Sequence, residues 1–277
     1  MPTLSSIIKK YRSDGIGGVT RAFVQRLFYS RPQIHPVEVA LEEILRNDDF
    51  TIVQIGAYVG NTANDPIFPT IKRWSARLAQ RDDGRRRIIL VEPVKQYFEK
   101  LRVNYADIPG AHFENVAVSD EPGTATLYQL GVDPAAYGYP EWLSQLSSLK
   151  AERINELVDG DVKQFYLRNR VAYQVECVRF STLVERYSLK TIDLLQIDIE
   201  GYEYELLKTV DFESLPIRFI NYESEVMFGK KPKCERFLRS NKYRLIDYEN
   251  DTFCYCPCDR HLIERGVYAS SGIGRRT

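Results

Sequence analysis

Residues 191–208 constrain the fold of this chain more than any other stretch, because an apolar run passes directly into two acids and a helix-like pattern. Residues 192–199 are short and rich in Ile and Leu, which is typical of a strand buried on both faces. Asp198 and Glu200 stand where that strand should end. Open α/β sheets bind ligands beyond the carboxyl ends of their strands. We therefore expect a functional site here; the alternative is that Asp198 only caps the next helix.

Composition excludes several classes of protein. The 277 residues are 44% hydrophobic and 27% charged with a formal net charge of zero, as in an ordinary globular protein, and give no argument for nucleic acid as a partner. No apolar run approaches the ~20 residues of a transmembrane segment. Residues 1–10 lack the apolar core of a secretory signal, and five cysteines do not suggest a disulfide framework. We expect a cytoplasmic protein.

Three regions follow from charge and pattern. Residues 1–36 form a basic helical N-terminal arm, residues 37–268 a single domain, and residues 269–277 a disordered tail. We interpret the arm as a solvated helical cap on the domain. The alternative is that it docks to a partner or an anionic surface.

Strand and helix patterns alternate along the domain. Strands are expected at 50–56, 87–92, 111–118, 174–180, 192–199 and 217–225, with helices between most of them and a hairpin from 243 to 256. An insertion at about 131–170 interrupts the order. This pattern predicts an α/β fold with a doubly wound, mostly parallel sheet and an antiparallel last strand.

The ends of the first two strands suggest a nucleoside site. Gly56 and Gly60 follow the first strand, where the backbone has to approach a ligand closely. The third glycine of the dinucleotide fingerprint is missing. Glu92 ends the second strand, and one carboxylate there can accept hydrogen bonds from both ribose hydroxyls. Alternatively, Glu92 caps the helix at 94–105.

Four motifs occur in order and carry a family resemblance: Val-Gln-Ile-Gly-Ala-Tyr-Val-Gly-Asn-Thr at 53–62, Val-Glu-Pro at 91–93, Glu-Asn-Val-Ala-Val-Ser at 114–119 and Leu-Leu-Gln-Ile-Asp-Ile-Glu-Gly-Tyr-Glu at 194–203. Together they resemble the FkbM-type family of S-adenosylmethionine-dependent methyltransferases over about residues 50–250. The resemblance implies a seven-stranded, Rossmann-like methyltransferase sheet. It also implies O-methylation of a hydroxyl on a sugar, a glycan or another small hydroxylated acceptor.

The resemblance implies a set of cofactor-binding residues: Gln54, Gly56, Ala57, Tyr58, Gly60, Glu92, Pro93, Asn115, Ala117 and Asp198. Glu92 would hold the ribose, and Asp198 would lie beside the sulfonium and the incoming hydroxyl. Tyr58 stands where the family usually carries Asn. Its ring either stacks on a ligand or closes part of the pocket.

The chemistry assigns roles to three acids and two serines. A sugar hydroxyl is a poor nucleophile, so a positioned base helps, and Asp198 is our choice for it. Glu200 and Glu223 would orient the acceptor; a divalent metal held by the three acids is possible but not favoured. Ser147 and Ser148 are candidate acceptor contacts, with a helix cap as the equal alternative.

Other interpretations remain open at this point. The chain could be a non-catalytic nucleotide or adenosine-cofactor binding protein in which Tyr58 fills the pocket. A nicotinamide-dependent oxidoreductase is a weaker alternative. Cys254, Cys256 and Cys258 could hold zinc, although buried reduced cysteines are favoured because zinc sites prefer Cys-x-x-Cys.

Overall fold

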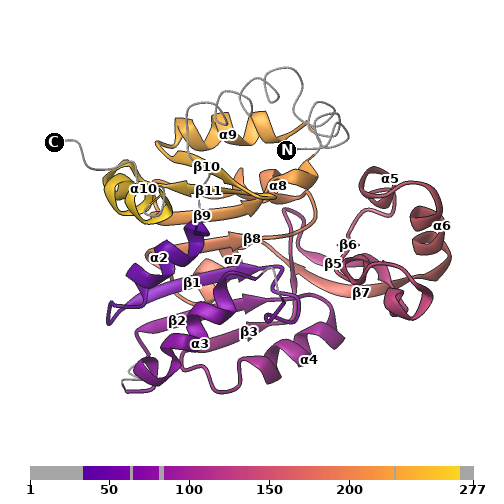
Figure 1. The fold of residues 1–277 in the computed structure, drawn as a ribbon, viewed down its shortest axis with the longest axis horizontal. Coiled ribbons are helices and arrows are strands. Elements are labelled where there is room, and N and C mark those ends of the chain that lie inside the picture. Colours follow the sequence, from indigo (N-terminus) through magenta and orange to yellow (C-terminus); the bar gives the residue numbers. More distant parts are fainter. Residues whose placement is uncertain (1–33, 63–64, 81–83, 228, 269–277) are drawn as a thin grey trace.

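The computed structural model describes residues 34–62, 65–80, 84–227 and 229–268 (Figure 1). Most of the predicted basic arm and the whole predicted tail lie outside the described residues. Among the described helices, none is long and apolar enough to cross a membrane. The cytoplasmic location stays a prediction.

A seven-stranded sheet forms the centre of the domain, in the order β10-β11-β9-β8-β1-β2-β3. Five neighbouring strands run parallel, and β11 is antiparallel to both β9 and β10. The predicted fold class is therefore confirmed, and β11, the last strand in the chain, is the antiparallel one. The strands of this sheet are β1 (Phe50–Ile55), β2 (Arg86–Val91), β3 (Ala111–Glu114), β8 (Ile192–Ile197), β9 (Ile217–Glu223), β10 (Arg244–Tyr248) and β11 (Asp251–Tyr255).

Helices cover both faces of this sheet because its strands are apolar on both sides. In β1, Val53 and Ile55 face one layer, whereas Phe50 and Ile52 face the other. The first layer comprises α7 (Phe180–Arg186), α8 (Glu203–Leu207) and α9 (Lys231–Ser240). The second comprises α2 (Pro36–Ile44), α3 (Ile67–Leu78), α4 (Lys95–Asn104) and α10 (Arg260–Tyr268). Helix α10 was not predicted from the sequence.

A second sheet, in the order β4-β7-β5-β6, replaces part of the predicted pattern. Its strands are β4 (Ala117–Val118), β5 (Gly123–Leu130), β6 (Ser147–Ser148) and β7 (Arg170–Val178). The predicted strand at 111–118 is split, since its first part joins the main sheet and its last two residues pair with β7. The predicted strand at 174–180 belongs to this second sheet, where β7 pairs antiparallel with β5 along its length.

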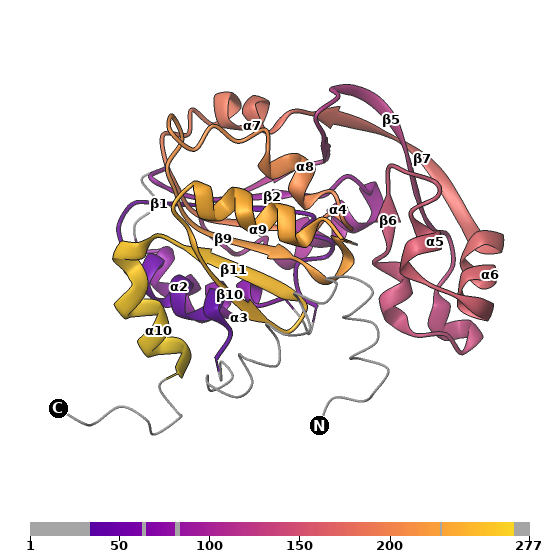
Figure 2. The same ribbon diagram turned by 90° about the horizontal axis from the view of Figure 1, so that it is seen from above.

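The insertion leaves β5 and returns in β7, and both views place it beside the carboxyl ends of the central strands (Figures 1 and 2). It carries two 3₁₀ turns (Pro134–Tyr137 and Glu141–Ser144) and the helices α5 (Ile154–Leu157) and α6 (Gly160–Asn169). A further 3₁₀ turn (Glu225–Met227) follows β9, and another (Pro257–Asp259) precedes α10. A separate small core that includes Leu143 and Phe165 holds the insertion together.

That separate core predicts local unfolding. Leu143 is 0% exposed, so Leu143→Ala should cost about 2–5 kcal/mol, the usual range for a buried leucine. We expect faster amide hydrogen exchange across the insertion and unchanged exchange in β1 and β8. An equal loss of protection in both regions would contradict this separation.

Candidate functional site

Asp198 follows β8 directly, at the carboxyl edge of the sheet between β1 and β9. Its backbone N–H donates to the Ile55 carbonyl oxygen at 2.9 Å, which extends the β1–β8 ladder by one residue. A Cβ on Gly56 would lie 1.7 Å from the Asp198 carbonyl oxygen, and the φ of Gly56 is +80°. The close approach expected at Gly56 is therefore made by the backbone of Asp198, and only glycine leaves room for it.

The loop between β8 and α8 is held by Glu203. This side chain is 0% exposed, and its Oε1 accepts from the N–H groups of Ile199 and Gly201, both at 3.0 Å. No side chain caps the start of α8. The alternative that Asp198 caps this helix is therefore wrong, and Glu203 orders the turn instead.

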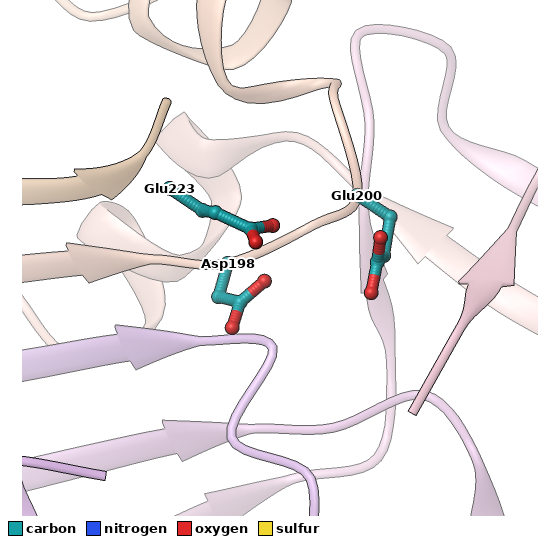
Figure 3. Close-up of side chains that lie close together, drawn as sticks. All are labelled: Asp198, Glu200 and Glu223. Carbon is teal, nitrogen blue, oxygen red and sulfur yellow. The ribbon is translucent and has the colours of Figure 1, made fainter. Parts of the chain in front are cut away.

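Three carboxylates meet at this edge. Asp198 and Glu200 come from the loop after β8, and Glu223 is the last residue of the neighbouring strand β9. The pairing of Ile197 with Tyr222 sets Asp198 beside Glu223. One oxygen from each of the three carboxylates lies within 4.8 Å of the others, and Figure 3 shows the three side chains close together. We call this group the carboxylate trio.

Burial and mutual repulsion disfavour the charged forms of the trio. The pKa of Asp198 is raised to about 7, by burial first and then by the charges of Glu203 and Asp251. The pKa values of Glu200 and Glu223 are also raised, by burial and then by the charge of Asp198. Asp198 is nevertheless exposed, because its carboxylate faces a cavity. Water there moderates the shift.

Glu92 provides a fourth carboxylate at the end of β2, where its side chain is fixed. Its two oxygens accept from the N–H groups of Tyr58 (2.9 Å) and Val94 (2.8 Å). The Asn115 amide donates to the carbonyl oxygens of Glu92 and Pro93 at 2.8 and 3.0 Å. Burial raises the pKa of Glu92 to about 7. No side chain caps the start of α4, so the alternative that Glu92 caps this helix is wrong; its bond to Val94 fixes the residue before the helix.

A cavity of about 290 Å³ lies between these strand ends and the insertion. The strand ends contribute Gly56, Tyr58, Glu92, Asp198 and Glu200. The second sheet contributes an apolar part, and the insertion contributes polar and charged groups. These two parts include Val116, Ala117, Val118, Leu127, Ser147, Ser148, Lys150, Arg153 and Glu156.

Comparison with known proteins identifies the family. The family model described as "Methyltransferase FkbM domain" matches residues 54–245. The chain belongs to the FkbM methyltransferase family. It is also similar to the crystal structure of ribosomal protein L11 methylase from Lactobacillus delbrueckii subsp. bulgaricus. That likeness has 11% identity and a TM-score of 0.33, and it covers 79% of this chain and 76% of the other. No curated protein matches the chain.

Many of the residues expected in the site of this FkbM methyltransferase line the cavity: Gly56, Tyr58, Glu92, Pro93, Ala117, Ser147, Ser148, Asp198 and Glu200. Glu223 is not among the lining residues but completes the trio behind Asp198. Gln54, Ala57, Gly60 and Asn115 do not line it either. Gly60 packs against Leu101 and Tyr105 of the main core, and Asn115 acts on the backbone around Glu92.

Several lining residues escaped the sequence analysis, among them Tyr97, Leu127, Lys150, Arg153, Glu156, Tyr202 and Lys230. Tyr97 lies in the first turn of α4, close to the Val-Glu-Pro motif, so its place after that motif was a usable signal. Arg153 lies in the insertion, where no local pattern marks it. Only the docking of the insertion brings it to the cavity.

The ring of Tyr58 packs against the ring of Tyr97, with 4.3 Å between the ring centroids. Its hydroxyl lies 3.3 Å from Ser144 Oγ, and the Tyr97 hydroxyl donates to the Ser144 carbonyl oxygen at 3.0 Å. Both rings line the cavity. Tyr58 therefore joins the first loop to the insertion and forms a wall of the cavity.

Among the described residues, the trio is the group of His, Cys, Asp or Glu side chains that lie close enough together to bind one metal ion. Carboxylate oxygens are ligands that Mg²⁺ and Ca²⁺ accept. Within the residues that the structure describes, Cys254, Cys256 and Cys258 do not form a group that could bind a metal ion. They are free thiols that range from buried to exposed. The zinc alternative therefore finds no support there.

Asp198→Asn should make the protein more stable at high pH. A carboxyl whose folded pKa is about 7 and whose unfolded pKa is about 4 destabilises the fold progressively as pH rises through that window. Asn carries no charge, so the gain should be near zero at pH 4 and complete above pH 7. Water in the cavity limits it to about 1 kcal/mol, or ~2–4 °C in melting temperature. A lower melting temperature at pH 8 would mean that the carboxylate stabilises the fold.

Proposed function

We propose that this methyltransferase uses S-adenosylmethionine to methylate a hydroxyl group on a sugar, a glycan or another small hydroxylated acceptor. The observation that carries the proposal is the carboxylate trio, whose Asp198 faces a cavity also lined by the fixed carboxylate Glu92. One carboxylate suits a proton acceptor, and the other suits a ribose.

The cavity has the acceptor and apolar groups that this cofactor requires. Glu92 already accepts one backbone N–H at each oxygen, and each oxygen has a further lone pair for a ribose hydroxyl. Ala117 and Leu127 would face the adenine, and Gly56 the methionine part. A sulfonium is cationic, so a place near the trio would relieve its repulsion. When bound, the cofactor supplies the electrophilic methyl group.

Asp198 would take the proton from the acceptor hydroxyl. A general base works best when its pKa lies near the working pH, and the pKa of Asp198 is about 7. Burial and then the charges of Glu203 and Asp251 raise that pKa, and Glu200 and Glu223 would orient the hydroxyl. Ser147 and Ser148 lie on the insertion side of the cavity and would contact the acceptor. The divalent-metal alternative stays open and is not favoured.

The alternative of a protein that binds an adenosine cofactor without chemistry depended on Tyr58 filling the pocket. The ring packs against Tyr97 and leaves a cavity of about 290 Å³ beside it. This arrangement favours a catalytic protein.

Asp198→Asn should lower turnover by about 10²–10⁴-fold, the range for a positioned acid–base group. Methyl transfer from labelled S-adenosylmethionine to glycans extracted from the source cells measures it, and mass spectrometry identifies the product. Asp161→Asn, an exposed acid of α6, is the matched control. Full turnover by a folded Asp198→Asn protein would remove Asp198 from the reaction.

Glu92→Gln should weaken S-adenosylmethionine binding by about 1.5–3 kcal/mol, the cost of losing hydrogen bonds to a charged group. Its amide cannot accept from both Tyr58 and Val94, so some stability should be lost as well. Titration calorimetry below the melting temperature separates the two effects. Glu99→Gln, an exposed change on α4, is the control. Unchanged affinity would argue against the ribose assignment.

A further inference from the structure

Arg153 belongs to the insertion, and its largely covered side chain contacts the loop of the carboxylate trio. Its side chain is only 10% exposed. Nε donates to the Glu200 carbonyl oxygen at 2.9 Å, and one terminal nitrogen donates to the Val226 carbonyl oxygen. The other terminal nitrogen pairs with Glu156 one turn away. A single guanidinium therefore joins three segments that are far apart in sequence.

The loop is shaped to receive this guanidinium. A Cβ on Gly201 would lie 1.6 Å from one terminal nitrogen of Arg153 and 2.4 Å from its central carbon. Gly201 also has a φ of +93°, which side chains with a Cβ rarely adopt. The backbone conformation thus requires glycine next to Glu200, and a side chain there would displace the guanidinium.

Fixing the backbone on both sides of Glu200 fixes its carboxylate. Glu203 holds the N–H groups of Ile199 and Gly201, and Arg153 holds the carbonyl oxygen of Glu200. Glu200 itself has a φ of +56°, a conformation that costs a non-glycine residue free energy. Burial and then the charge of Asp198 raise the pKa of Glu200, so the charged form of Glu200 is disfavoured beside Asp198. Without these bonds the loop could relax and carry Glu200 out of the trio.

We propose that Arg153 is a positioning residue of this methyltransferase: it couples the docking of the insertion to the placement of the Glu200 carboxylate. The insertion then forms the acceptor side of the cavity and also keeps Glu200 in the trio. A guanidinium suits this role because its planar fork serves several acceptors at once, which an ammonium cannot do with the same geometry. The expected effect of Arg153 on binding of the positively charged cofactor rests on the proposed function, but its expected effect on the loop after β8 does not.

Arg153→Lys and Gly201→Ala test the proposal without changing the charge of the protein. Arg153→Lys removes the planar guanidinium, and Gly201→Ala places a Cβ where the guanidinium lies and so displaces it. Arg168→Lys, an exposed arginine of the same insertion, is the control. Both test variants should speed amide hydrogen exchange at Ile199 and Gly201 by about tenfold, as expected for losing a charged hydrogen bond. Exchange in β1 should not change.

Affinity for S-adenosylmethionine relative to S-adenosylhomocysteine gives the second readout, because only the first carries the sulfonium charge. Titration calorimetry should show this preference falling about threefold in both test variants as Glu200 moves away. If exchange and preference both match the wild type, Arg153 is only a structural tether and the proposal is overturned. If the wild type shows no such preference, the proposed cofactor site fails, and exchange alone decides the role of Arg153. Should Gly201→Ala not fold, Arg153→Lys decides.

Discussion

Repulsion among carboxylates at the ends of parallel strands is the constraint on which the site depends. Parallel strands end at the same edge of a sheet, so the register of β8 and β9 sets Asp198 beside Glu223. Burial raises the pKa of each member of the trio, and the charge of Asp198 raises the pKa values of Glu200 and Glu223 further. The fold holds them together because two apolar layers and a continuous ladder fix the strands. A cation bound here would relieve the repulsion. We therefore interpret the trio as part of a binding site and not as a structural feature.

Acids in this region divide into two kinds by what their oxygens accept. Glu92 and Glu203 accept backbone N–H groups, so they order the loops after β2 and β8. Asp198 faces the cavity and Glu223 stands beside it; Glu223 Oε2, like Glu203 Oε2, is buried without a hydrogen-bond partner among the described residues. Groups of the first kind stabilise the architecture. Groups of the second kind cost stability and are available for chemistry, as is usual at active sites.

The insertion closes the site from the other side and is attached at two places. Tyr58 and Tyr97 meet Ser144 near the end of β2, and Arg153 reaches the loop after β8. Because the insertion has its own small core, it can differ in sequence and shape without disturbing the main sheet. Acceptor selection in this methyltransferase is therefore expected to depend on the insertion, whereas the sheet fixes the carboxylates.

The sequence by itself determined the sheet, its parallel core and the position of Asp198, Glu200 and Glu92 at strand ends, because apolar periodicity and strand termination are local properties. It placed the strand at 174–180 in the wrong sheet and did not predict α10. Local periodicity does not specify which strands pair with one another or where a long insertion runs. Tertiary structure alone decided which acids accept hydrogen bonds from backbone N–H groups and which face the cavity, since the sequence does not distinguish a glutamate in one role from a glutamate in the other. It also decided the place of Arg153, which reaches Glu200 only when the insertion folds back across 47 residues of chain.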